Sequence, residues 1–174
     1  MTTSLVSKLF GEVFQTERSA RRHPRIEAKR LGPCPPASAL LAVSAHAARV
    51  EPQLNALASA RGHRASSIGT AVGSLFSRGR TGFADFFFTT ERSYRATLLG
   101  MRHGFDLIVV FGAAARAEGD SELAAWCDEW LAERGALIAD VAASVTWFGR
   151  HPERALKSAK RKTRDGATRH ADAL

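Results

Sequence analysis

The sequence has few cysteines and no long hydrophobic run. Its 174 residues include two cysteines, Cys34 in a proline-rich turn and Cys127 inside an apolar helical pattern. Two cysteines in such different contexts form neither a disulfide framework nor a metal cluster, which favours a reducing compartment. No apolar run reaches the roughly 18 residues of a membrane span, and Lys8 and Glu12 interrupt the N-terminal stretch where a signal peptide would be apolar. We therefore expect a cytoplasmic protein without a membrane span.

The sequence also lacks the short motifs that carry chemistry in many enzymes. It contains no phosphate-binding loop, no nucleophile elbow, and no Ser, His and Asp at the spacing of a catalytic triad. Cys127 lies in an apolar pattern, where a thiol is inert. No catalytic residue is predicted and no cofactor is expected.

Acidic residues are scarce at the two ends of the chain. Residues 1–30 carry seven Lys and Arg against three acidic side chains, and residues 150–174 carry eight against three, whereas residues 31–149 carry ten against eleven. Contact with a polyanion is therefore expected through the terminal segments and not through a groove of the fold. Such contact would be salt-sensitive and independent of sequence. The candidate residues are Arg21, Arg22, Arg25, Lys160, Arg161 and Lys162.

Apolar residues recur at helical spacing along most of the chain. Residues 3–18 predict a short amphipathic helix, and residues 18–36 are rich in arginine and proline, which is typical of an exposed linker. Further helices are expected over residues 37–61, 66–78, 89–119 and 121–148. The predicted domain organisation is a helix and basic linker over residues 1–36, a four-helix bundle over 37–150, and a basic tail over 151–174. The basic extensions at both ends are expected to be partly disordered.

The last two predicted helices are long and equal in length. At 1.5 Å per residue, residues 89–119 and 121–148 would form helices of about 43 Å and 42 Å. Gly119 and Asp120 supply a helix stop followed at once by an N-cap. Two long helices joined by so tight a turn lie antiparallel. The fold class predicted from these patterns is all-α, an antiparallel four-helix bundle.

These two helices carry a resemblance to a known superfamily. The segments "ERSYRATLLGMRHGFDL" and "DSELAAWCDEWLAERGALIADV" resemble, in helix order, length and pattern, the ferritin-like superfamily, and the resemblance extends over residues 37–148. It implies a bundle that binds two metal ions through carboxylates and Glu-x-x-His pairs. None of the six histidines has a carboxylate three positions earlier. We therefore expect a ferritin-like fold without the superfamily's usual metal ligands and without its oxidase or iron-storage chemistry.

An irregular metal site is the main alternative. Antiparallel pairing of the two long helices would bring Asp106 near Glu133, and His103 and Glu91 lie on the same helix as Asp106. These four side chains are candidate ligands for iron or manganese. On the helical wheel, however, Asp106 aligns with charged residues of a solvated face, and His103 aligns with apolar residues, where partial burial is expected.

Three other features concern packing. Arg134 lies on the apolar seam of its helix, so we expect it to pair with an acidic side chain or to extend into solvent. Gly100 and Gly104 would let a neighbouring backbone or ring approach closely. The three tryptophans, Trp126, Trp130 and Trp147, are expected in the core or in a subunit contact.

The sequence thus favours a non-catalytic structural or interaction protein that forms a homo-oligomer or binds a protein partner. The alternatives are a metal-binding or oxidoreductase protein using Glu91, His103, Asp106 and Glu133, and a nucleic-acid-binding accessory protein acting through its basic tails.

Overall fold

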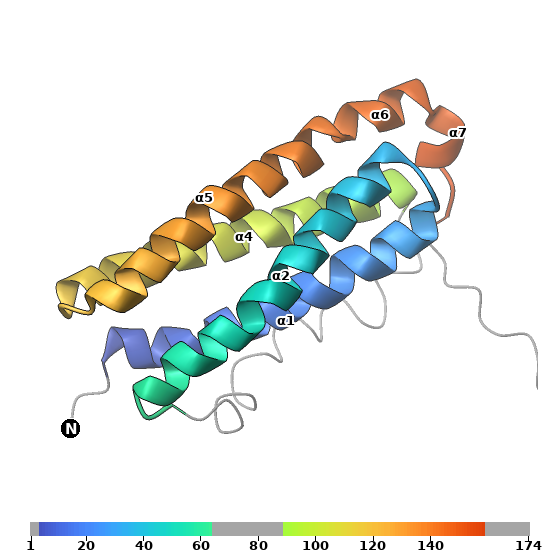
Figure 1. The fold of residues 1–174 in the computed structure, drawn as a ribbon. Helices are drawn as coiled ribbons and strands as arrows, with labels where there is room; N and C mark the ends of the chain where they lie inside the picture. Colours follow the sequence, from blue (N-terminus) through green and yellow to red (C-terminus); the bar gives the residue numbers. More distant parts are fainter. Residues whose placement is uncertain (1–3, 64–88, 159–174) are drawn as a thin grey trace, which may run out of the picture.

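The structure is a computed structural model that describes residues 4–63 and 89–158 (Figure 1). These residues form helices joined by short turns, together with one isolated bridge between Thr89 and Ser158. The helices are α1 (Leu5–Leu31), α2 (Pro35–Ala60), α4 (Thr90–Ala117), α5 (Ser121–Ala143), α6 (Val145–Arg150) and α7 (Pro152–Ala155).

The four long helices pack as two antiparallel hairpins, α1 with α2 and α4 with α5 (Figure 1). The hairpins face each other, so that α1 also packs on α4 and α2 on α5. The expected all-α, antiparallel four-helix bundle is confirmed.

The end of α2 and the start of α4 lie at opposite ends of the bundle. The ring of His63, just after α2, packs at a tilt against that of Phe10 near the start of α1, with ring centroids 4.9 Å apart. At the start of α4, by contrast, the backbone N–H of Thr90 donates a hydrogen bond to the carbonyl of Lys157 at 2.8 Å. Residues 64–88 therefore connect two distant ends, and α2 and α4 run in the same direction (Figure 1).

The N-terminal region forms a longer helix than the sequence predicts. The basic linker predicted over residues 18–36 is wrong, because α1 continues as one helix of 27 residues to Leu31 and includes Pro24. The buried positions Ala20, Pro24, Ala28 and Leu31 keep the three- and four-residue spacing of a packed face. Packing of that face offsets the hydrogen bond that Pro24 cannot donate. Thus α1 belongs to the bundle, and the helix predicted over residues 66–78 lies outside the described residues.

The predicted boundaries of α2 and α4 and the predicted start of α5 are confirmed within two residues. The hydroxyl of Thr89 accepts a hydrogen bond from the N–H of Arg92 and caps α4, and the Asp120 carboxylate accepts one from Leu123 and caps α5. Gly119, in the turn between them, has a φ of 76°, which glycine adopts without strain. The helix predicted to reach residue 148 is interrupted at Ser144, whose hydroxyl bonds to the Asp140 carbonyl, a contact that bends helices.

The apolar core is divided into two clusters along the bundle axis. One cluster surrounds Phe10, Leu54 and Phe111, near the turn between α4 and α5, and the other surrounds Leu40 and Tyr94 at the opposite end. Between them, the middle of the bundle contains buried charged side chains. These buried charged side chains form the candidate site.

Candidate functional site

Three buried polar side chains meet at the centre of the bundle, one from each of three helices. Glu17 of α1, His46 of α2 and Arg134 of α5 have exposed fractions of 1%, 1% and 2%. The Arg134 guanidinium forms a salt bridge with Glu17, with Nη2 2.8 Å from Oε2. Its Nε donates to Nδ1 of His46 at 2.9 Å. We call Glu17, His46 and Arg134 the central ion-pair layer.

The central ion-pair layer is connected to the surface through His46. Because Nδ1 accepts from Arg134, a neutral His46 carries its proton on Nε2, which lies 3.3 Å from Oε2 of Glu133. The exposed Glu133 carboxylate in turn pairs with Arg49. A chain of close polar contacts therefore runs from the buried Glu17 through Arg134, His46 and Glu133 to the exposed Arg49.

The environment of the layer shifts the pKa values of its members. Burial and, after it, the charge of Arg134 lower the pKa of His46, and Glu133 opposes them, so that the pKa lies at about 4. Burial also raises the pKa of Glu17, against the effect of its salt bridge with Arg134. The hydrogen bond from Arg49 lowers the pKa of Glu133. At neutral pH, His46 is thus an uncharged acceptor for a buried guanidinium.

The indole ring of Trp130 completes the surroundings of Arg134. The guanidinium carbon lies 4.7 Å from the ring centroid, a distance suited to a cation–π interaction. Arg134 therefore has an anionic partner, a neutral acceptor and an aromatic face. The expectation that Arg134 pairs with an acidic side chain is confirmed.

A second buried carboxylate lies further along α1. Glu27, with an exposed fraction of 3%, accepts a hydrogen bond from the hydroxyl of Ser93 on α4 at 2.9 Å. Arg30, one turn away, approaches the same oxygen at 3.2 Å. Glu27 therefore links α1 to α4, as Glu17 links α1 to α5.

The candidate metal ligands do not converge. Glu91 pairs with Arg95, whereas Glu133 pairs with Arg49 and His46 and not with Asp106. Asp106 is exposed as expected, but His103 is exposed too, so its predicted partial burial is wrong. Within residues 4–63 and 89–158, no three or more His, Cys, Asp or Glu side chains form a group able to hold a metal ion.

Sequence patterns revealed only one member of the central ion-pair layer. Arg134 stood out because a charged residue interrupted an apolar seam. Glu17 and His46 carry the same signal, since each falls between buried residues at helical spacing, Glu17 between Val13 and Ala20 and His46 between Val43 and Val50. Glu17 was missed because the arginines that follow it gave the segment the composition of a surface.

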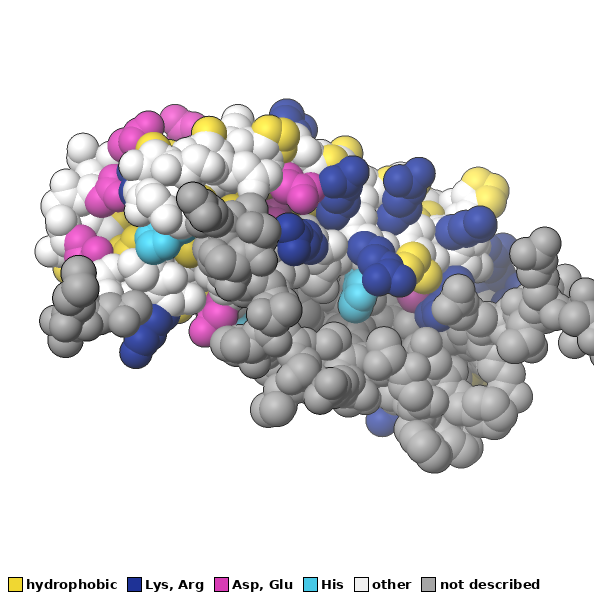
Figure 2. All heavy atoms as spheres, turned by 90° about the horizontal axis from the view of Figure 1, so that it is seen from below, with side chains coloured by type: hydrophobic (Ala, Val, Ile, Leu, Met, Phe, Trp, Pro, Cys, Tyr) yellow, Lys and Arg dark blue, Asp and Glu magenta, His cyan; other side chains and the backbone are white. Residues whose placement is uncertain are grey.

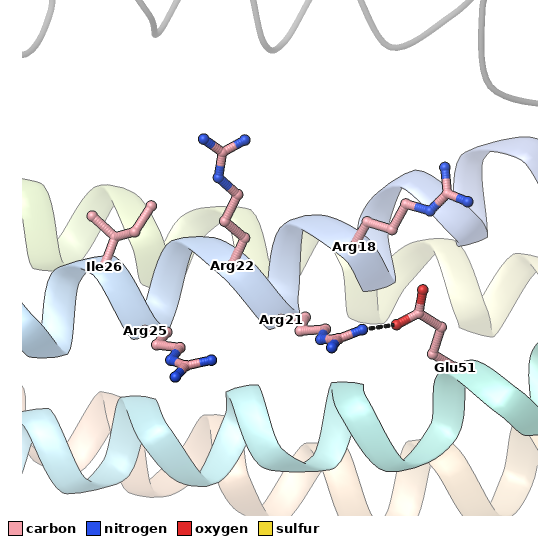
Figure 3. Close-up of a pocket in the computed structure, with 6 residues that line it drawn as sticks. All are labelled: Arg18, Arg21, Arg22, Arg25, Ile26 and Glu51. Atoms are coloured by element: carbon pink, nitrogen blue, oxygen red, sulfur yellow. Dashed lines mark hydrogen bonds and ion pairs between the residues drawn. The ribbon is translucent and has the colours of Figure 1, made fainter.

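The arginines of the predicted linker lie on an ordered helix. A shallow pocket of about 350 Å³ lies beside α1 (Figure 3). It is lined by Arg18, Arg21, Arg22, Arg25, Ile26 and Glu51. The predicted polyanion contacts Arg21, Arg22 and Arg25 therefore belong to one helical surface, whereas Lys160, Arg161 and Lys162 lie outside the described residues.

Cys127 and Tyr94 are buried side chains whose surroundings indicate a structural role. Cys127 is fully buried, as predicted, and burial raises the pKa of its thiol to about 12, so the nucleophilic thiolate is not formed at neutral pH. The Tyr94 hydroxyl donates to the carbonyl of Val141 at 3.0 Å and joins α4 to α5. Both residues therefore serve the packing of the core.

Helix α4 is long and apolar enough, by length and composition, to cross a membrane, but half of its most apolar window is buried inside the bundle. A core helix passes the same test, so this is weak evidence for a membrane span. No protein-family model matches the chain, and neither a curated protein nor a solved structure shows detectable similarity to it.

Proposed function

We propose that this protein is a non-catalytic helical bundle of ferritin-like type that acts as a structural or interaction module. The observation that carries the proposal is Arg134, which fills the middle of the bundle with a side-chain cation bound to Glu17 and His46. In ferritin-like proteins that bind metal, inward-facing carboxylates and histidines hold metal cations in the bundle core.

The order of the helices supports the ferritin-like assignment. Two antiparallel hairpins are joined by one long connection between parallel helices α2 and α4 (Figure 1). A single long crossover distinguishes ferritin-like bundles from simple up-and-down bundles.

The residues of the central layer support the loss of metal chemistry. Glu17 and His46 are side chains of the types that bind iron, but Val43 stands three residues before His46, and Leu131 three residues before Arg134. A metal ion beside Glu17 would have to displace or repel the guanidinium of Arg134, whose charge already balances that carboxylate. The arrangement favours a fixed ion pair over an exchangeable metal.

Metal analysis of the full-length, untagged protein tests this proposal. We expect iron and manganese far below one equivalent in protein purified from iron- and manganese-supplemented cells. Near-stoichiometric metal that is lost on His46→Ala would overturn the proposal and place a site in the central layer. Near-stoichiometric metal lost on His103→Ala, but kept in His46→Ala, would instead support the alternative site of Glu91, His103, Asp106 and Glu133.

Self-association in the cytoplasm is part of the same proposal. Leu99 and Val110, three turns apart on one face of α4, have exposed fractions of 69% and 49%, and Val109 beside them has 46%. Exposed apolar side chains on one face are typical of a contact with a partner. Sedimentation velocity should show a dimer or larger species that Leu99→Glu dissociates, and a monomer over the accessible concentration range would remove oligomerisation from the proposal.

A further inference from the structure

Helix α1 presents a row of cationic side chains along its exposed face. Arg18, Arg22, Arg25 and Lys29 follow one another at steps of four, three and four residues, and all are exposed. Steps of three and four keep side chains on one side of a helix. Figure 2 looks onto this side of the molecule and shows Lys and Arg side chains gathered along it. We call Arg18, Arg22 and Arg25 the arginine face.

The arginine face differs from other arginines of the bundle in its pairing. Three exposed arginines elsewhere have carboxylate partners, namely Arg49 with Glu133, Arg95 with Glu91 and Arg116 with Asp128. Beside the arginine face, Arg21 pairs with Glu51 at 2.6 Å (Figure 3). Within the described part of the chain, Arg18, Arg22 and Arg25 form no salt bridge with a carboxylate.

The remaining segments of the chain cannot supply the missing negative charge. Residues 64–88 contain three arginines and one acidic residue, and residues 159–174 contain five Lys and Arg against two acidic residues. Both segments are themselves basic, so they cannot neutralise the arginine face as a whole. A polyanion that complements the arginine face would therefore be another molecule.

We propose that the arginine face binds the phosphate backbone of a nucleic acid. Guanidinium groups match phosphate oxygens with two parallel hydrogen bonds each. Arg18 and Arg25 are about 10 Å apart along a rigid helix axis, so the three arginines present a dense, linear row of charge to a linear polyanion. The proposal rests on the assigned role as an interaction module and names its partner.

The composition of the same face argues against a membrane surface. A helix that lies in a lipid interface buries an apolar face among the lipids. The apolar face of α1 is instead buried in the bundle, and Ile26 is the one large apolar side chain that lines the pocket with the arginines. The lining has no aromatic side chain for stacking on a base and no amide for pairing with adenine. Because the proposal assigns its arginines to phosphates and not to guanine, binding should be independent of sequence.

Salt dependence gives the proposal a quantitative form. Each phosphate neutralised on duplex DNA contributes about −0.9 to the slope of log K against log salt concentration. Contacts by three arginines therefore predict a slope of about −3 from this face. Replacing all three with glutamine should remove most of that slope and weaken binding at low salt by at least about tenfold.

The experiment is fluorescence anisotropy of the full-length protein with two labelled duplexes of unrelated sequence, at several salt concentrations. The test variant is Arg18→Gln/Arg22→Gln/Arg25→Gln, and the matched control is Arg95→Gln/Arg102→Gln/Arg116→Gln, which removes the same charge from exposed positions of α4. Circular dichroism establishes that both remain folded. We expect equal affinity for the two duplexes, a large loss in the test variant and a small loss in the control.

Several results would overturn the proposal. These are wild-type binding by the test variant, equal losses in the two triple variants, and loss confined to Lys160→Gln/Arg161→Gln/Lys162→Gln, which would assign binding to the tail. Binding to phosphatidylserine vesicles without binding to DNA would assign the arginine face to a membrane surface. The metal analysis is independent of all these outcomes, so the two proposals fail separately.

Discussion

Arg134 illustrates how one residue can define the centre of a fold. A buried guanidinium is costly to desolvate, and here the cost is offset by a carboxylate, an imidazole acceptor and an indole face. The partners come from α1, α2 and α5, so the layer forms only when the three helices have their native rotation. The central ion-pair layer therefore specifies the register of the bundle.

Removing one charge of the pair should be worse than removing both. Arg134→Met leaves the Glu17 carboxylate buried without its counter-charge, which is expected to cost about 3–5 kcal/mol of unfolding free energy. Glu17→Met/Arg134→Met removes both charges and keeps similar volumes, so it should be clearly more stable than Arg134→Met. Urea denaturation at neutral pH measures both. If the double variant is no more stable than Arg134→Met, the stabilising effect of Arg134 does not come from its ion pair with Glu17.

His46 should make the stability of the protein depend on pH. Its folded pKa of about 4 lies below the unfolded value of 6.5, so the unfolded chain takes up the proton first as the pH falls. The stability contributed by neutral His46 is therefore complete above pH 6.5 and is lost between about pH 6.5 and 4. The loss would reach at most about 3 kcal/mol from a shift of this size.

The control for this prediction is His46→Asn, which keeps an acceptor for Arg134 but does not titrate. Both proteins contain Glu17, so subtracting their urea midpoints across pH 4–7 isolates the histidine. The wild type should lose more stability than His46→Asn as the pH falls. Parallel curves would contradict the lowered pKa of His46.

At the scale of the helix, Gly104 shows how closely α1 and α4 approach. A Cβ atom at this position would lie 2.5 Å from Cγ2 of Thr16 on α1, which is well inside van der Waals contact. The expectation that a glycine of the Gly100-x-x-x-Gly104 pair permits close packing is confirmed for Gly104, whereas Gly100 is exposed. The facing residue, Thr16, lies in the first half of α1, within the helix predicted over residues 3–18.

Gly104→Ala should therefore destabilise the bundle although alanine favours helix. Overpacking is expected to cost about 1–3 kcal/mol against a gain of up to about 1 kcal/mol from helix propensity. Thr16→Ser removes the facing methyl group, so Gly104→Ala/Thr16→Ser should recover most of the loss. Gly149→Ala is the matched control, since nothing lies within 4 Å of a Cβ added there. If Gly104→Ala has the same melting temperature as Gly149→Ala, the contact between residue 104 and Thr16 relaxes without cost, and the prediction is wrong.

Helices α2, α4 and α5 could be predicted because their signals are local. Caps such as Asp120, stops such as Gly119 and unbroken apolar stripes set their boundaries. Helix α1 was predicted only in its first half, because Pro24 and the neighbouring arginines have the composition of a linker. Its burial of Glu17 and Glu27 depends on partners more than sixty residues away, which no local pattern indicates.

The candidate site shows the same division between local and distant information. Arg134 could be identified from its place on an apolar seam, and an acidic partner could be expected on energetic grounds. That the partner is Glu17, and that His46 accepts from the same guanidinium, follows from how the hairpins face each other. Glu133 was placed near Asp106 by antiparallel pairing, but its side chain points to α2 and pairs with Arg49.

At the scale of the whole molecule, charge is distributed unevenly. The chain carries 25 Lys and Arg against 17 Asp and Glu, and the arginine face adds like charges at adjacent turns of α1. Like charges four residues apart, such as Arg18 and Arg22, destabilise a helix by about 0.2–0.5 kcal/mol for each pair. The arginine face is therefore a locally unfavourable arrangement within α1.

This repulsion predicts how stability should respond to salt. Added salt screens the arginine face, so the unfolding free energy of the wild type should rise between about 20 and 200 mM sodium chloride as the Debye length shortens. Arg18→Gln/Arg22→Gln/Arg25→Gln should be slightly more stable than the wild type at the lower concentration and nearly equal to it at the higher one. Arg95→Gln/Arg102→Gln/Arg116→Gln removes the salt bridges of Arg95 and Arg116, so it should be no more stable than the wild type at either concentration. Urea midpoints of the three proteins decide the matter, and an arginine-face variant less stable than the wild type at low salt would mean that these arginines are held by attractive contacts within the chain.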